Sequence, residues 1–171
     1  MMNKMNKLNL TIILILVLLL FFFGIGGFPL IVKHTKNQII NTNNSKIFNP
    51  LRNKKDLEYN KIVLIMDWND WNNLPKKIAK RRVLICTDNK ILEQLKNYFI
   101  FEQTEGDMAT VTSTIIIFND KEIVFKSHIS IDKHSIGIQG EKTGYSKSLY
   151  TKELYELFMQ FKPYRKIILN I

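Results

Sequence analysis

The stretch Ile62–Cys86 reads IVLIMDWNDWNNLPKKIAKRRVLIC and sets the architecture of the chain. Its two ends are short continuous apolar runs, Ile62–Met66 and Val83–Cys86. Runs of this length without polar alternation are typical of strands buried on both faces, as in a parallel sheet covered by helices. Between them, Pro75–Arg82 predicts a short helix with proline in its first turn.

Two longer helices are expected after this stretch. Thr87-Asp88 is a good N-cap for a helix that runs to Phe99. Its apolar residues share one helical face: Ile91, Leu92, Leu95 and Tyr98. A second helix starts near Thr151 and must end before Pro163, because the residue before a proline avoids the helical region. Its apolar residues also have helical spacing: Leu154, Leu157, Phe158 and Phe161.

The segment between these helices predicts an antiparallel hairpin. Its first strand alternates through Val111, Ser113, Ile115 and Ile117, and its second through Ile123, Phe125, Ser127, Ile129 and Ile131. A loop of Asn119, Asp120 and Lys121 would pair Ile117 with Ile123 and Ile115 with Phe125. Gly137, Gly140 and Gly144 then indicate an irregular connection, and Tyr164–Ile171 a last strand.

The fold class is therefore α/β or α+β. Residues 59–171 are expected to form one small mixed-sheet domain, with two main helices and an antiparallel hairpin. At about 113 residues, such a domain is large enough for one hydrophobic core.

The N-terminal part of the chain has the pattern of a membrane anchor. Leu8–Val32 contains 25 residues without a charge, and a helix needs about 20 apolar residues to cross a bilayer. We expect residues 1–7 to be a short tail, 8–32 a transmembrane signal-anchor helix, and 33–58 a polar, flexible linker. A cleaved signal peptide is the alternative, with Gly24 and Gly26 as the small residues before the cut.

The flanking charges favour an extracytoplasmic domain. The basic residues on the two sides of the apolar run are close to balanced. A short tail with two lysines and a free amine is costly to translocate, whereas a long C-terminal domain crosses regardless of its charge. The expected protein is single-pass, with the N-terminus in the cytoplasm and the lipid bilayer as its first partner.

The formal net charge of +10 is unevenly distributed. Residues 1–55 hold eight Lys and Arg and no acidic residue, so 56–171 hold the other 17 basic and all 15 acidic residues, a balance of +2. A nucleic-acid-binding domain would carry the excess on its own surface, and none is expected here. The three histidines and one cysteine have no zinc spacing and no phosphate loop is present, so we expect no metal and no cofactor.

The most distinctive residues of the domain are the two tryptophans, Trp68 and Trp71, within a polar loop. Exposed tryptophans often anchor a protein partner; the alternative is that they cover the edge of the core. A basic segment follows at once, and four of its residues would share one face of the expected helix: Lys76, Lys77, Lys80 and Arg81. Such a face binds polyanions or lipid headgroups, unless it is only a solvated turn. Loop and turn together are the expected interaction surface.

Three further residues are candidates for catalysis. If the two apolar strands are parallel neighbours, Asp67 and Asp88 meet at the carboxyl edge of the sheet, where they could act as an acid/base pair. The alternative is that Asp88 is a helix cap and Asp67 a turn residue. Cys86 precedes a helix N-terminus, which can lower a thiol pKa. It would need His128 or His134 as a base, and is otherwise a core residue.

Three functions fit this plan. The first is a membrane-anchored binding or accessory protein of the cell envelope, which binds a protein partner through Trp68, Trp71 and the basic turn. The second is a small anchored enzyme, hydrolase-like, that uses Asp67 and Asp88. The third is a structural subunit of a membrane complex. No catalytic motif stands out in the sequence, so it favours binding over catalysis.

Overall fold

The structure is a computed structural model that describes residues 9, 11–20, 30–32, 46–51, 59–76, 78, 81–104, 113–140, 144–164 and 168–170. The chain divides into two compact units. One is Thr35–Tyr164, and the other combines Met1–His34 with Arg165–Ile171. Each unit is described by itself.

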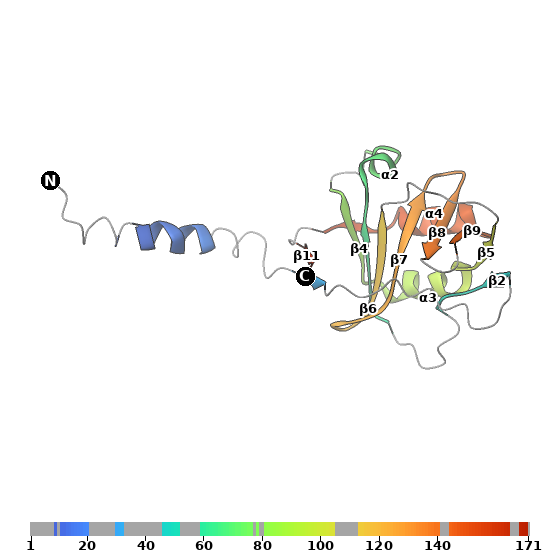
Figure 1. Ribbon diagram of the computed structural model, residues 1–171, viewed down its shortest axis with the longest axis horizontal. Coiled ribbons are helices and arrows are strands. Elements are labelled where there is room, and N and C mark those ends of the chain that lie inside the picture. Colours follow the sequence, from blue (N-terminus) through green and yellow to red (C-terminus); the bar gives the residue numbers. More distant parts are fainter. Residues whose placement is uncertain are drawn as a thin grey trace. The chain divides into compact units, whose positions relative to one another are not determined.

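The larger unit is an α+β domain built on a nine-stranded antiparallel sheet (Figure 1). The strand order is β10-β4-β3-β6-β7-β8-β9-β5-β2, and every neighbouring pair is antiparallel. The strands are β2 (Ile47–Phe48), β3 (Lys61–Ile65), β4 (Val83–Cys86), β5 (Phe101–Gln103), β6 (Thr114–Asn119), β7 (Glu122–Ile131), β8 (Ile136–Gly140), β9 (Gly144–Ser148) and β10 (Lys162–Pro163). The helices are α2 (Trp68–Asn72), α3 (Asn89–Tyr98) and α4 (Thr151–Phe158).

The sheet is antiparallel throughout, so the predicted mixed sheet is wrong, and β3 and β4 are not the parallel neighbours that an acid/base pair would require. Ile62 lies opposite Cys86 and Ile65 opposite Val83, so the two strands are antiparallel neighbours. A parallel pair needs a crossover that covers the sheet, whereas this connection folds straight back on itself. The Met66 amide donates to the Arg82 carbonyl at 2.7 Å, and Arg82 Nε donates to the Met66 carbonyl at 3.0 Å. The expectation of strands buried on both faces holds for β3, where Ile62, Val63 and Leu64 are all buried.

Both longer helices predicted from the sequence are confirmed, and both contribute to one core. α3 buries Leu92 and Leu95, and α4 buries Leu154, Leu157 and Phe158. The facing strand residues of the same cluster include Ile62, Leu64, Ile115, Ile117, Phe125 and Ile129. We call this side of the sheet the core face and the opposite side the outer face. Burial of each such side chain contributes about 1.5–3 kcal/mol, so this cluster is the main source of stability.

The β6–β7 hairpin has a different register from the predicted one. Ile117 lies opposite Phe125, not Ile123, and the turn is Asp120-Lys121 between the paired residues Asn119 and Glu122. The register shifts after Ile117, because Val124 is an extra residue in β7. A β-bulge of this kind re-aims the strand. Because of the bulge, Phe125, Ser127, Ile129 and Ile131 share the core face with Ile115 and Ile117, as predicted. Ile123 does not share it, since it lies opposite Phe118 of the outer face, and Val111 lies outside the described residues.

Part of the predicted linker belongs to the domain. β2 pairs with β5, which sets Phe48 opposite Phe101, and Phe48 and Leu51 are buried in the core. Asn49 is buried as well: its Nδ2 donates to the Lys96 carbonyl at 2.7 Å, and its Oδ1 accepts from the Leu51 amide. Lys96 lies in the last turn of α3, where carbonyls lack a partner within the helix. The other residues of the linker, 33–45 and 52–58, lie outside the described residues.

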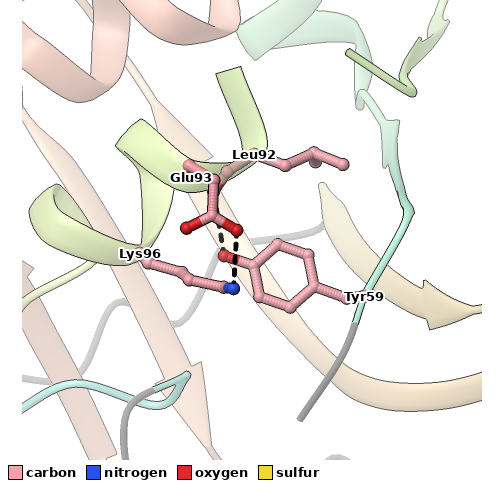
Figure 2. Close-up of polar contacts among 4 residues, drawn as sticks. All are labelled: Tyr59, Leu92, Glu93 and Lys96. Atoms are coloured by element: carbon pink, nitrogen blue, oxygen red, sulfur yellow. Dashed lines mark hydrogen bonds and ion pairs between the residues drawn. The ribbon is translucent and has the colours of Figure 1, made fainter. Parts of the chain in front are cut away.

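The chain is also tied to α3 where it enters β3 (Figure 2). The hydroxyl of Tyr59 donates to the Leu92 carbonyl at 2.9 Å. Lys96 Nζ lies 4.9 Å from the centre of the Tyr59 ring and 2.8 Å from Glu93 Oε1. Burial, and then the charge of Glu93, raise the pKa of Tyr59, so this hydroxyl stays protonated and keeps its donor role.

In the smaller unit, β1 (Leu30–Val32) pairs in parallel with β11 (Ile168–Asn170). The last predicted strand is thus present over Ile168–Asn170, while Pro163 lies in β10. Residues 9 and 11–20 are helical. No helix among the described residues is both long enough and apolar enough to span a membrane.

The predicted anchor of residues 8–32 needs one correction. Leu30–Val32 lie in a strand and not in a helix. Pro29 precedes them, and proline lacks the N–H that an α-helix needs, while Ile168–Asn170 offer a hydrogen-bonding edge. Residues 8, 10 and 21–29 of the predicted anchor lie outside the described residues.

The glycine-rich segment near residue 140 is a hairpin, not the irregular connection that was predicted. β8 and β9 pair from Gly137 opposite Lys147 to Gly140 opposite Gly144. At Gly137 the ring of Tyr145 lies so close that a Cβ would be 2.2 Å from its atoms. Glycine is needed there for close packing, because any side chain would collide with the ring.

We expect Gly137→Ala to destabilise the domain by about 1–3 kcal/mol, the usual cost of overpacking. In a Tyr145→Ala background the same substitution should cost much less, since the colliding ring is absent. Urea unfolding of the wild type, the two single variants and the double variant gives the coupling free energy between positions 137 and 145. An equal cost in both backgrounds would show that the Tyr145 ring is not what excludes a side chain at position 137.

Candidate functional site

The tryptophan segment forms a short helix, α2, at one end of the sheet (Figure 1). Asp67 is its N-cap: its Oδ1 accepts a hydrogen bond from the Asp70 amide at 2.7 Å. A capping aspartate satisfies an amide that has no partner inside the helix. The predicted loop is therefore a capped helical turn with a defined orientation.

The two tryptophans of α2 have different environments. Trp71 is half-buried and packs against the core, whereas Trp68 is 60% exposed. The two rings lie 4.9 Å apart at an interplanar angle of 47°. Trp71 therefore covers the edge of the core. The Trp68 ring lies against the Trp71 ring, with most of its own surface in solvent.

A buried serine fixes α2 to the sheet. The amide of Asp67 donates to Ser113 Oγ at 2.8 Å, and Ser113 Oγ donates to Asp70 Oδ2 at 2.6 Å. Desolvation by burial raises the pKa of Asp70, and the charges of Asp67 and Asp132 raise it further. Hydrogen bonds from Ser113 and from the Ile131 backbone act in the opposite direction. The carboxylate of Asp70 thus joins the helix to Ser113, just before β6, and to the end of β7.

The helix predicted at Pro75–Arg82 is not found in the described residues of that segment. Lys76 and Ile78 lie in turns, and Arg81 and Arg82 lie in bends. Leu74 is buried, and the Met66–Arg82 hydrogen bonds close the connection soon afterwards, which leaves little length for a helix. Lys76 and Arg81 are exposed. Lys77 and Lys80 lie outside the described residues, so the shared helical face is not supported.

Asp67 and Asp88 lie at opposite ends of the sheet. The register that pairs Ile62 with Cys86 sets Asp88 opposite Asn60, seven residues before Asp67. At about 3.3 Å per residue, the two are roughly 20 Å apart. Asp88 Oδ1 accepts from the amides of Lys90 and Ile91, as an N-cap does. The antiparallel pairing thus prevents the acid/base pair, and both aspartates are caps.

Cys86 is buried in the core, with 4% of its surface exposed. Burial raises the pKa of its thiol, and the charge of Asp88 adds to this, so the helix N-terminus does not yield a reactive thiolate. His128 lies on β7, three strands away and on the outer face, and His134 lies in the turn beyond the far end of β7. Neither histidine can serve as its base.

Within the described part of the chain, no group of three or more His, Cys, Asp or Glu could hold a metal ion. The sequence reasoning missed a different cluster, on the outer face of β7 and β9. His128 Nδ1, Ser130 Oγ and Tyr145 Oη are buried and have no hydrogen-bond partner. Polar residues at alternate positions of β7, at Lys126, His128 and Ser130, were the available signal.

No protein-family model matches this chain, and no curated protein or solved structure is significantly similar to it.

We expect Asp88→Ala to lower the free energy of unfolding by about 1 kcal/mol, because α3 loses its N-cap. Asp88→Ser is the matched variant, since a serine hydroxyl can also cap, and it should remain close to wild type. Urea unfolding measures both. Equal losses in the two variants would contradict the capping role.

The raised pKa of Asp70 gives a prediction with a definite sign. Between the ordinary value of 3.8 and the raised pKa, the folded state binds more protons than the unfolded state. The free energy of unfolding therefore falls as pH rises through this window. Asp70→Asn keeps an acceptor for Ser113 but does not titrate, so it should flatten this dependence. Urea unfolding at a series of pH values tests this, with Glu102→Gln as a control, and an unchanged slope would contradict it.

Proposed function

We propose that this protein is a single-pass, membrane-anchored binding protein of the cell envelope. Its domain binds a protein partner through Trp68 on α2 and the basic side chains of the turn that follows, including Lys76 and Arg81. The single observation that carries the proposal is the exposure of Trp68, at 60%, on a helix that is itself held firmly. Tryptophan is among the residues that most often dominate binding energy at interfaces.

The firm attachment of α2, which carries Trp68, to the rest of the domain supports this role. Trp71 and Leu74 attach α2 and its continuation to the core, and Asp67 and Asp70 attach it to Ser113. A side chain presented on a fixed backbone loses little conformational freedom when it binds, so more of the contact energy appears as affinity.

The charged residues near Trp68 suggest the chemistry of the partner's binding surface. Lys76, Arg81 and Arg82 are exposed on the same β3–β4 connection. The two carboxylates of this connection, Asp67 and Asp70, are engaged in hydrogen bonds with the Asp70 amide and with Ser113. The complementary surface is an apolar pocket with acidic residues at its rim. Rim charges act mainly on the association rate, which should therefore fall with ionic strength.

The uncharged N-terminal run supports an anchor for this domain. With Leu30–Val32 in β1, the span is shortened to residues 8–29, which is 22 residues. That length still matches the approximately 20 residues that a transmembrane helix needs. The proposed orientation keeps the N-terminus in the cytoplasm and the domain outside, so the partner is another envelope protein.

The two alternative functions make different demands. The hydrolase-like enzyme needs Asp67 and Asp88 together, and their positions at opposite ends of the sheet give it no support. A structural subunit needs only a stable domain and does not depend on Trp68.

The test uses the full chain in its membrane, with a photo-crosslinking residue at the exposed position Asn69 beside Trp68. We expect it to capture a specific protein, and Trp68→Ala to lower the yield at least tenfold, since loss of a dominant tryptophan costs about 2 kcal/mol or more. The matched controls are a crosslinker at Lys121, on the hairpin turn, and the variant Lys121→Ala. An undiminished crosslinking yield with Trp68→Ala would rule out this surface. Protease digestion of intact cells tests on which side of the membrane the domain lies.

A further inference from the structure

A second set of residues lies on the outer face, away from the core helices. In β7 the residues Phe125, Ser127, Ile129 and Ile131 are buried on the core face. Because side chains alternate along a strand, Lys126, His128 and Ser130 lie on the outer face. Their neighbours across the sheet share this face: Gln139 and Gly137 on β8, and Tyr145 and Lys147 on β9.

Gly137 brings the hydroxyl of Tyr145 towards β7. The Tyr145 oxygen lies 2.2 Å from the position that a Cβ of Gly137 would occupy. Ser130 is the direct partner of Gly137 in β7, and His128 is the next outer-face residue of that strand. The ring therefore lies over β8, and its hydroxyl points across this strand towards Ser130 and His128. Only 7% of Tyr145 is exposed.

The three polar atoms of this cluster lack partners. His128 Nδ1, Ser130 Oγ and Tyr145 Oη are all buried, and none has a hydrogen bond within the structure. A buried polar group without a partner costs about 1–3 kcal/mol. Two of the three atoms lie on β7 and the third on β9, with β8 between. Trp71 Nε1 and Ser146 Oγ are also buried without a partner, whereas nearly all buried polar groups in native proteins are satisfied.

The chemistry of these atoms defines the ligand. Two hydroxyls donate, and an imidazole Nδ1 can carry a proton and donate as well. Lys126 precedes His128 on the same face of β7, and Lys147 lies opposite Gly137. Three carboxylates lie near this face: Glu102 is opposite Lys147 on β5, Asp132 follows Ser130 by two residues, and Asp70 accepts a hydrogen bond from the Ile131 backbone. We propose that His128, Ser130 and Tyr145 form a binding site for an oxyanion, a phosphate or carboxylate group, whose negative charge Lys126 complements.

This site and the surface around Trp68 use different side chains, and they are connected only through Asp70 of α2, which accepts a hydrogen bond from the backbone of Ile131, next to Ser130. The cluster lies on the outer face of β7–β9, whereas Trp71 attaches α2 to the core. The proposed site would bind a small anion, or the anionic group of a larger molecule, in addition to the proposed protein partner.

The test measures thermal unfolding of the purified full chain in detergent, with increasing inorganic phosphate or acetate at constant ionic strength set by sodium chloride. A ligand that binds only the folded state raises the unfolding temperature with its concentration. We expect a saturable rise with at least one of the two anions. The two titrations distinguish a phosphate from a carboxylate as the natural group.

Tyr145→Phe keeps the ring over Gly137 and removes only the hydroxyl, so it should fold. We expect this variant, and Ser130→Ala, to weaken the anion affinity at least tenfold. Without anion, each should unfold at the same temperature as the wild type or higher, because an unpartnered group has been removed. Tyr150→Phe, at an exposed tyrosine, is the matched control and should bind normally.

Two results would overturn the proposal. One is that neither phosphate nor acetate stabilises the protein beyond chloride. The other is a stabilisation that persists undiminished in Tyr145→Phe and Ser130→Ala, which would place the anion elsewhere. Trp68→Ala should leave anion binding unchanged, so failure of this site and failure of the protein-partner proposal are distinguishable.

Discussion

Hydrogen bonds between Met66 and Arg82 close the connection between β3 and β4, and this closure makes the two strands antiparallel. The positions of the other candidate residues follow from it. α2 is placed at the end of the sheet where β3 ends and β4 begins, and the N-cap of α3 is placed at the other end. The same pairing that exposes a tryptophan beyond one end therefore separates two carboxylates that a parallel sheet would have brought together.

The sequence could predict the elements better than their pairing. α3 and α4 were found from helical spacing and from the Asp88 cap, because these signals are local. A continuous apolar run such as Ile62–Met66 indicates a strand buried on both faces, but it contains no information about the direction of the neighbouring strand. β2 was missed because two residues are too short to show alternation, and it depends on contacts with β5 and α3 far away in the sequence.

The candidate surface was predictable as a segment but not in its detail. The sequence identified Trp68 and Trp71 together, yet it could not say which ring is buried. That choice depends on α2, whose cap at Asp67 and link through Ser113 combine residues that follow β3 and precede β6. The Asp67 to Asp70 spacing, an N-cap followed by a partner three residues later, was the one local signal for this helix.

The polar groups of the domain separate into two kinds. Tyr59, Asn49 and Asp88 each satisfy a backbone group, so the fold alone accounts for their presence. His128, Ser130 and Tyr145 satisfy none, and apolar residues of similar shape would stabilise the sheet. Residues that break a local rule without a structural gain are the ones expected at functional sites.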